Sequence, residues 1–299
     1  MSLNGGFRYR ERLPEAAQGR TLLGYLSERY RHSSILEWQR RIESGLVLVE
    51  GEPASADRAL AAGESLVWNR PPWQEPTAPV SFAVLYEDED VLGVAKPAGL
   101  PTIPGGSFLE NTLLARVRRR YPKASPLHRL GRGTSGIVLF ALNREARRAL
   151  TRAWEDSVER RYRGIVSGLF PEGEMVLEHP IGLVPHSLLG SVHAASAAGK
   201  RARSRVRLLE HRRDRSLVEI EIETGRTHQI RIHLAAAGHP LLGDSLYPPG
   251  GVPAPDRAVL PGETGYALHA YRVRLAHPRT AREVVILCGP PPLYRAKTE

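Results

Sequence analysis

The sequence of 299 residues predicts an α+β protein with two folded units. Apolar residues make up 41% of the chain, short β-rich runs outnumber the helical ones, and one proline-rich segment interrupts the pattern. A chain of this length can bury one large core and a second, smaller one. Many strands with few helices favour a central sheet that is mainly antiparallel or mixed.

The N-terminal unit carries two helical patterns followed by short strands. Apolar residues recur at helical spacing in Leu22–Leu26 and Ile35–Ile42. The β-rich runs after them are Leu46–Gly51 and Ser65–Trp68. The segment Arg70–Pro79 then brings four prolines, which remove backbone donors and favour an extended chain. We therefore place one unit at residues 1–72 and the other at residues 80–299.

The larger unit is predicted to contain many strands and one clear helix. Asn143 is suited to cap a helix that extends to about Arg160, because Ala146, Leu150 and Trp154 recur at helical spacing. The predicted strands are Ala83–Tyr86, Val91–Ala95, Tyr162–Val166, Arg203–Leu209, Leu217–Ile222 and Val284–Leu287.

The charge balance indicates a polyanionic partner. The chain has 42 Lys plus Arg against 32 Asp plus Glu, and its formal net charge is +10. Nearly all the cations are arginines, whose planar guanidinium groups suit phosphates, although a codon bias would enrich arginine as well. Between Asn111 and Arg144 there is no acidic residue, whereas eight basic residues fall in this window. Such a window attracts a phosphate backbone, but it is also compatible with a solvated basic face.

A few residues bear on the cellular compartment and on whether the protein binds a metal ion. A single cysteine, Cys288, cannot form an internal disulfide, and the polar N-terminus has no apolar targeting segment. We expect a cytoplasmic protein that does not enter a membrane and acts as a monomer. If Thr227–His233 forms a strand, alternation places His228 and His233 on opposite faces. The two histidines could not then share a zinc ion, so no metal is expected.

One motif suggests a different class of function. Gly131–Gly136 matches the three-glycine fingerprint of dinucleotide-binding folds, and Glu155 lies where a ribose-binding acid would be expected. A true fingerprint opens a helix, however, whereas Ile137–Leu142 is a β-rich apolar run. A nucleotide-cofactor enzyme is therefore disfavoured; a helix directly after Gly136 would revive it.

Two further blocks carry a resemblance to a known family. His128–Gly136 reads His-Arg-Leu-Gly-Arg-Gly-Thr-Ser-Gly, and Thr224–Leu234 is followed closely by Gly238–Tyr247. Together with Lys96–Leu100, Arg160–Tyr162 and Leu268–Tyr271, these blocks resemble the RluA-type RNA pseudouridine synthases in order and spacing. The resemblance covers about residues 83 to 292. It implies a pseudouridine synthase fold, ribosomal or transfer RNA as the partner, and no organic cofactor or metal.

The resemblance also implies roles for particular residues. Pseudouridine formation breaks the glycosidic bond of uridine, rotates the uracil and rejoins it through carbon, after the base has left the helical stack. Arg129 would fill the space of the flipped nucleotide, Tyr162 would stack on the uracil, and Arg231 would pair with the catalytic aspartate. The other residues expected at the RNA are His128, Arg132 and Thr134. Taken alone, Tyr162 is equally consistent with a core position at the start of a strand.

The N-terminal unit has a resemblance of its own. Ser33 and Ser34 precede the second helical pattern, and Arg40 and Arg41 follow within it. This layout resembles the small alpha-L RNA-binding module, in which Arg40 and Arg41 would face phosphates. A capping subdomain without RNA contact is the alternative.

Gly131 departs from the family pattern, which has the catalytic aspartate at this position. Glycine has no side chain that could attack a sugar or take a proton, and an unpaired Arg231 would be costly to bury. Asp244 or an RNA phosphate is expected to neutralise it. Two readings of the function remain open: an active synthase with an altered site, and an RNA-binding protein that has lost the reaction. Tritium release by the natural chain and by Gly131→Asp would separate them.

Overall fold

The computed structural model describes residues 2–155, 157–253 and 265–297. The chain divides into two compact units, residues 1–76 and 77–299, so the division falls within the proline-rich segment. No helix among the described residues is long and apolar enough to cross a membrane.

The N-terminal unit packs two helices against a four-stranded sheet. Its elements are β2 (Phe7–Arg12), α1 (Leu22–Arg29), α2 (Ile35–Glu43), β3 (Val47–Val49), β4 (Glu52–Pro53) and β5 (Ser65–Arg70), with sheet order β2-β5-β3-β4. A short 3-10 turn (Glu15–Ala17) precedes α1, and β1 (Ser2–Leu3) pairs with β6 (Gln74–Glu75). Ser34 caps the N-terminus of α2 and forms a capping box with Glu37. Their side chains accept hydrogen bonds from backbone N–H groups that have no partner within the helix. Trp38 and Ile42 on the apolar face of α2 are buried in the core of this unit.

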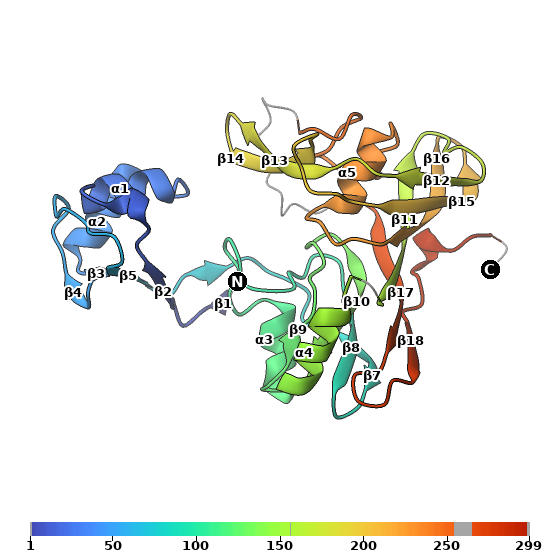
Figure 1. Ribbon diagram of the computed structural model, residues 1–299, viewed down its shortest axis with the longest axis horizontal. Coiled ribbons are helices and arrows are strands. Elements are labelled where there is room, and N and C mark those ends of the chain that lie inside the picture. Colours follow the sequence, from blue (N-terminus) through green and yellow to red (C-terminus); the bar gives the residue numbers. More distant parts are fainter. Residues whose placement is uncertain (1, 156, 254–264, 298–299) are drawn as a thin grey trace. The chain divides into compact units, whose positions relative to one another are not determined.

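The larger unit is built on one ten-stranded mixed sheet (Figure 1). Its main order is β12-β15-β16-β11-β17-β10-β8-β7, and β18 and β9 pair with β17 and β10 beside this path. The strands are β7 (Ala83–Glu87), β8 (Val91–Lys96), β9 (Ser125–Pro126), β10 (Ser135–Ala141), β11 (Glu159–Ser167), β12 (Glu174–Leu177), β15 (Ser204–Arg212), β16 (Arg215–Ile222), β17 (Leu268–Ala276) and β18 (Glu283–Leu287). A separate hairpin consists of β13 (Ile181–His186) and β14 (Gly190–Ala195), and a 3-10 turn (Pro292–Tyr294) lies near the C-terminus. The predicted α+β class with a mixed central sheet is confirmed.

Helices cover both faces of the sheet around β10. Alternate residues of a strand point to opposite faces. Val138 and Phe140 belong to the core cluster that includes Leu113 and Val117 of α3 (Leu113–Arg120). The intervening Ile137 and Leu139 pack in a second cluster with Leu150 of α4 (Arg144–Ala153). Because β10 is buried on both faces, its sequence is a continuous apolar run without alternation.

The two central strands, β10 and β17, run parallel for only two residue pairs. Ser135 lies opposite His269 and Gly136 opposite Ala270. Beyond this short contact, β17 pairs with β11 and β18, while β10 pairs with β8 and β9. The loops that enter β10 and β17 therefore meet at one place, where the candidate site is found.

One predicted strand is a helix. Residues Gln229–Ala236 form α5, which begins after His228 in the left-handed conformation. The amide oxygen of Gln229 accepts hydrogen bonds from the Thr224 hydroxyl and the Arg226 backbone N–H, which closes the turn before the helix. All residues of α5 except the last are buried, so its apolar residues show no helical periodicity, and the sequence alternates as in a strand.

Two smaller expectations also need correction. Asn143 caps α4 through the backbone N–H of Ala146, as predicted, but the helix ends at Ala153 instead of near Arg160. The chain enters β11 at Glu159, where pairing with β16 and β17 takes over from helix formation. The sequence pattern predicts no element at Leu113–Arg120, but these residues form α3, whose exposed face is mostly arginine.

Candidate active site

A cavity of about 380 Å³ lies where the loops before β10 and β17 meet the start of α5. The segment 127–131 and Thr134 form one wall, and β11 contributes Arg160 and Tyr162. The turn before α5 and its first residues contribute 225, 226 and 228–231. Tyr266 and Leu268 close it from the start of β17. Of the described residues that line the cavity, four are arginines and none is acidic. The cavity is thus suited to a neutral group attached to an anion.

The turn that carries Gly131 is held firmly in place. The Thr134 N–H donates to the carbonyl of Gly131 (3.1 Å), and the hydroxyl of Thr102 donates to the carbonyl of Leu130 (2.9 Å). The ammonium of Lys96 donates to the carbonyls of Pro97, Leu100 and Arg132. Lys96 is 2% exposed, and burial lowers its pKa to about 7. These bonds join the turn to the segment after β8.

Tyr266 explains two of the three glycines in this turn. Neither Gly131 nor Gly133 has a positive φ, so the backbone conformation does not require glycine there. A Cβ atom at residue 131 would lie 2.4 Å from the hydroxyl oxygen of Tyr266, and one at residue 133 would lie 2.9 Å from its ring. The third glycine, Gly136, has a φ of +107° and contacts the backbone of Ala270. The fingerprint-like spacing therefore results from packing, and the strand β10 that follows it excludes the dinucleotide motif.

Arg231 has a carboxylate partner within the chain. Its Nε and one terminal nitrogen donate to the two oxygens of Asp244 at 2.6 and 2.7 Å, and both side chains are buried. The rings of Tyr266 and Tyr247 lie near the guanidinium, with centroids 4.3 and 4.9 Å from its carbon. Burial disfavours the charged form, but the hydrogen bonds to Asp244 outweigh it and raise the pKa of Arg231. Asp244, one of the two anions expected from the sequence, is the partner.

Arg160 is a second buried arginine, in a different environment. One terminal nitrogen donates to the carbonyls of Ile222 and Glu223 at 3.4 and 3.0 Å, and its Nε has no hydrogen-bond partner among the described residues. Burial lowers its pKa. The ring of Trp154 lies 5.5 Å from its guanidinium carbon. The printed hydrogen bonds of this buried cation go to carbonyls and not to a carboxylate, so an anion that enters the cavity could pair with it.

Three of the residues predicted from the sequence to contact RNA lie at this cavity with Arg160. Tyr162 is buried, contributes to the main core cluster and also lines the cavity. Arg129 is exposed at the same cavity. His128 stacks on Trp154, and its Nε2 accepts from the backbone N–H of Leu139. Burial lowers the pKa of His128 to about 3, so the ring is a neutral acceptor. The prediction that these residues contact RNA stays a prediction.

The remaining predicted RNA contacts differ in accessibility. Thr134 is buried, and its hydroxyl bonds to that of Tyr266 at 3.2 Å. Arg132 is half-buried near the ring of Phe108. In the N-terminal unit Arg40 is exposed, whereas Arg41 lies against Trp38 and Trp68 and donates to Ser33.

The two histidines near Arg231 are engaged separately. His228 Nδ1 bonds to the hydroxyl of Tyr247 at 2.8 Å. The ring nitrogens of His233 lie within hydrogen-bond distance of the Ser204 hydroxyl and the His179 carbonyl. Each ring thus has partners of its own outside α5, although the element is a helix and not the predicted strand.

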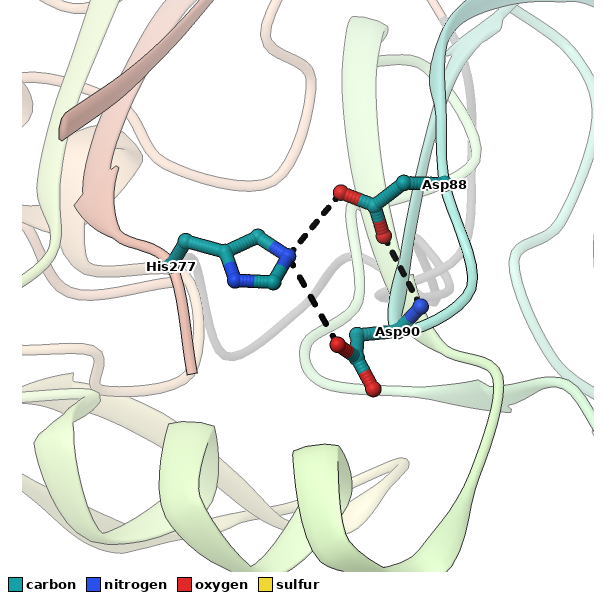
Figure 2. A group of neighbouring side chains, drawn as sticks. All are labelled: Asp88, Asp90 and His277. Carbon is teal, nitrogen blue, oxygen red and sulfur yellow. Dashed lines mark hydrogen bonds and ion pairs between the residues drawn. The ribbon is translucent and has the colours of Figure 1, made fainter. Parts of the chain in front are cut away.

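A separate group of Asp88, Asp90 and His277 has the composition of a metal site (Figure 2). The Nε2 of His277 lies 3.0 Å from Asp88 and 3.7 Å from Asp90. Asp90 also accepts from Asn143 (2.7 Å) and forms an ion pair with Arg279 (2.8 Å). Because the carboxylates are already bonded to donors, this cluster ties the β7–β8 turn to the residues after β17 and to the start of α4.

Sequence reasoning did not assign site roles to Arg160, Trp154, Arg226 or Tyr266. Arg160 lies within the Arg160–Tyr162 block of the family resemblance, so the sequence did indicate that it lies near the site. Tyr266 gave none, because only the folded chain brings it to Gly131.

Comparisons with known proteins agree with this geometry. The model of the RNA pseudouridylate synthase family matches residues 90–236. An uncharacterized RNA pseudouridine synthase from Synechocystis is 41% identical over 91% of this chain and 94% of its own length. RNA pseudouridine synthase 5 from Arabidopsis thaliana is 34% identical over 99% and 96%.

A bacterial relative and a solved structure extend the likeness. Ribosomal large subunit pseudouridine synthase D from Neisseria meningitidis is 34% identical over 90% of this chain and 75% of its own length. The structure of human RNA pseudouridylate synthase domain containing 1 matches with a TM-score of 0.56 and 25% identity, over 73% of this chain and 87% of that one. With the cavity and the ordered motifs around it, these matches show that the chain belongs to the RluA-type family of RNA pseudouridine synthases.

Proposed function

We propose that this chain isomerises uridine to pseudouridine in structured ribosomal or transfer RNA, after the uridine has flipped into the cavity beside Tyr162. The observation that carries the proposal is the lining of that cavity. Four arginines line it beside Tyr162, and no described lining residue is acidic. Two of them, Arg226 and Arg231, are already paired with carboxylates outside the lining. The other two, Arg129 and Arg160, have no carboxylate bonded to them among the described residues, so their charge is available to a phosphate. Uracil is flat and uncharged, whereas the phosphates on either side of it are anionic, so the cavity matches both parts of the ligand.

Three cavity residues have roles in this proposal. Tyr162 lies beside the flipped base and offers its ring for stacking. Arg129 is exposed and takes the space that the base leaves in the RNA helix. Arg160, whose charge has no carboxylate bonded to it among the described residues, binds a phosphate near the flipped nucleotide.

The reaction is tested by tritium release. Unmodified ribosomal and transfer RNA transcripts carrying tritium at carbon 5 of uridine are incubated with the natural chain. We expect release in proportion to the uridine converted, because the carbon-5 hydrogen leaves when the new bond forms. Tyr162→Ala should lower the rate by at least tenfold, whereas Tyr271→Phe, which removes a hydroxyl bonded to Glu219 outside the cavity, should leave it unchanged.

A second candidate function is RNA binding without the reaction. Gly131 favours it, because this position lacks the carboxylate that the family pattern places there. In that case transcripts would bind the natural chain tightly and no tritium would be released at any protein concentration.

A further inference from the structure

Tyr266 and Gly131 form a complementary pair. The hydroxyl oxygen of Tyr266 lies 2.4 Å from the point where a Cβ of residue 131 would stand. From ordinary bond lengths, an aspartate carboxylate oxygen lies about 2.4 Å from its own Cβ. The Tyr266 oxygen therefore lies as far from the Cβ position of residue 131 as the carboxylate oxygen of an aspartate at that residue would.

The surroundings keep this oxygen where it is. Its hydroxyl bonds to that of Thr134, the ring packs against Gly133, and the ring also lies 4.3 Å from the guanidinium carbon of Arg231. Tyr266 is 6% exposed and lines the cavity, so only its cavity side is open to a ligand. Its position is fixed by packing and does not depend on a mobile surface side chain.

We propose that Tyr266 is a catalytic residue of this chain, and that its hydroxyl oxygen faces the ribose of the flipped uridine from the place of the missing carboxylate. The inference rests on the proposed function and names the group that replaces residue 131 in it. Glycine at residue 131 then makes room for the Tyr266 hydroxyl, and its lack of a carboxylate does not by itself mean that the activity has been lost.

The step that this oxygen assists balances without a co-reactant. When the bond between N1 of uracil and C1′ of ribose breaks, its electron pair goes to N1 and C1′ gains positive charge. The lone pair of the Tyr266 oxygen stabilises that charge. After the base rotates, C5 forms the bond to C1′, the C5 proton leaves to solvent, and N1 takes a proton. The composition of the nucleotide is unchanged.

The same geometry predicts what an aspartate at residue 131 does in the natural background. The turn is bonded to Thr102 and Lys96, so it cannot easily withdraw. Gly131→Asp must instead displace the Tyr266 ring from Thr134 and Arg231. Restoring the carboxylate alone is therefore expected to lower both activity and stability.

The test measures single-turnover tritium release, RNA affinity and the urea midpoint for four chains: natural, Tyr266→Phe, Gly131→Asp, and Gly131→Asp with Tyr266→Ala. We expect Tyr266→Phe to lose at least 100-fold in rate with RNA affinity unchanged, since the ring is kept, and with only a small drop in urea midpoint from the lost bond to Thr134. Gly131→Asp should lose activity and shift its midpoint downward. The double variant, which has room for the carboxylate, should be at least tenfold faster than Gly131→Asp.

The outcomes separate this inference from the proposed function. Release by the natural chain with an unchanged rate in Tyr266→Phe overturns the role of Tyr266 and leaves the proposed function standing. A Gly131→Asp chain that is stable and faster than the natural one also overturns it, because the oxygen would not then occupy the carboxylate's place. No release by the natural chain contradicts the proposed function itself and Tyr266 with it.

Discussion

Arg231 and Arg160 line the same cavity and are both buried, but they are neutralised in different ways. Arg231 forms two short hydrogen bonds to Asp244, whereas Arg160 donates to two backbone carbonyls and keeps an unpartnered Nε among the described residues. Burying a charge is costly unless it is paired. At Arg231 the hydrogen bonds to Asp244 offset this cost within the folded chain. At Arg160 part of it is left for a ligand to relieve. We therefore expect Arg231 mainly to hold the site together and Arg160 mainly to bind RNA.

The largest expected effect is on stability, from removal of the carboxylate at Arg231. Asp244→Asn leaves the guanidinium buried without a counter-charge, and we expect it to lower the free energy of unfolding by about 3–5 kcal/mol in urea denaturation. A double variant that also carries Arg231→Met should recover part of this loss, since the unpaired charge is then gone. If the two substitutions simply add, the ion pair is not the coupling between these positions.

A third buried cation, Lys96, sharpens the comparison through pH. Burial lowers its pKa to about 7, whereas a lysine of the unfolded chain titrates near 10.4 (about the model-peptide value). Between these values the unfolded chain holds a proton that the folded chain lacks, so the contribution of Lys96 to the free energy of unfolding rises with pH.

The natural chain and Lys96→Met are compared by urea denaturation at several pH values from 6 to 10, in roughly half-unit steps. Relative to the variant, the natural chain should gain up to a few kcal/mol as the pH rises from about 7 to 10. A difference that stays constant over this window would mean that Lys96 remains charged in the folded protein.

Arg160 is expected to contribute mainly to RNA affinity. Arg160→Met should weaken transcript binding about tenfold and reduce the slope of log affinity against log salt by roughly one. The matched control is the neighbouring Arg161, which forms ion pairs with Glu159, Glu219 and Glu221. Arg161→Met should leave affinity and slope nearly unchanged. Equal losses in both variants would mean that the charge of Arg160 is no more available to RNA than that of the ion-paired Arg161.

The smallest effect concerns the N-terminal unit, where Arg40 and Arg41 repeat the contrast at the surface. Arg40 is exposed, and Arg40→Gln should weaken RNA binding by only a few-fold. Arg41 stacks on two tryptophans, so Arg41→Gln should instead lower the free energy of unfolding by about 1 kcal/mol. Loss of RNA affinity in Arg41→Gln but not in Arg40→Gln would reverse the assignment.

Local chemistry predicted the parts of the fold that depend on near neighbours. Asn143 caps α4, and Ser34 lies at the start of α2 where the helical pattern begins. Strands such as β8 and β10 follow from apolar runs that are too short for a helix. In each case the residues that decide the element lie within a few positions of each other.

Prediction failed where distant residues decide the structure. In α5, the polar side chains of Gln229, Arg231 and His233 are buried because Ser204, Asp244 and backbone carbonyls satisfy them. Their alternation with isoleucines therefore imitates a strand.

Some residues of the candidate site could be predicted from the sequence, and others could not. Family resemblance placed Arg129, Tyr162 and Arg231 at one site, and all three line one cavity. The reason for Gly131 lies in Tyr266, far along the chain, where no sequence pattern points to it.

We propose that this chain both holds a flipped uridine and converts it. The most direct measurement is a single-turnover experiment in which RNA binding and tritium release are followed in the same sample, with protein in excess over a transcript labelled at carbon 5. We expect release from the bound transcript to reach the amount of target uridine. Saturated binding with no release above the protein-free control would contradict it.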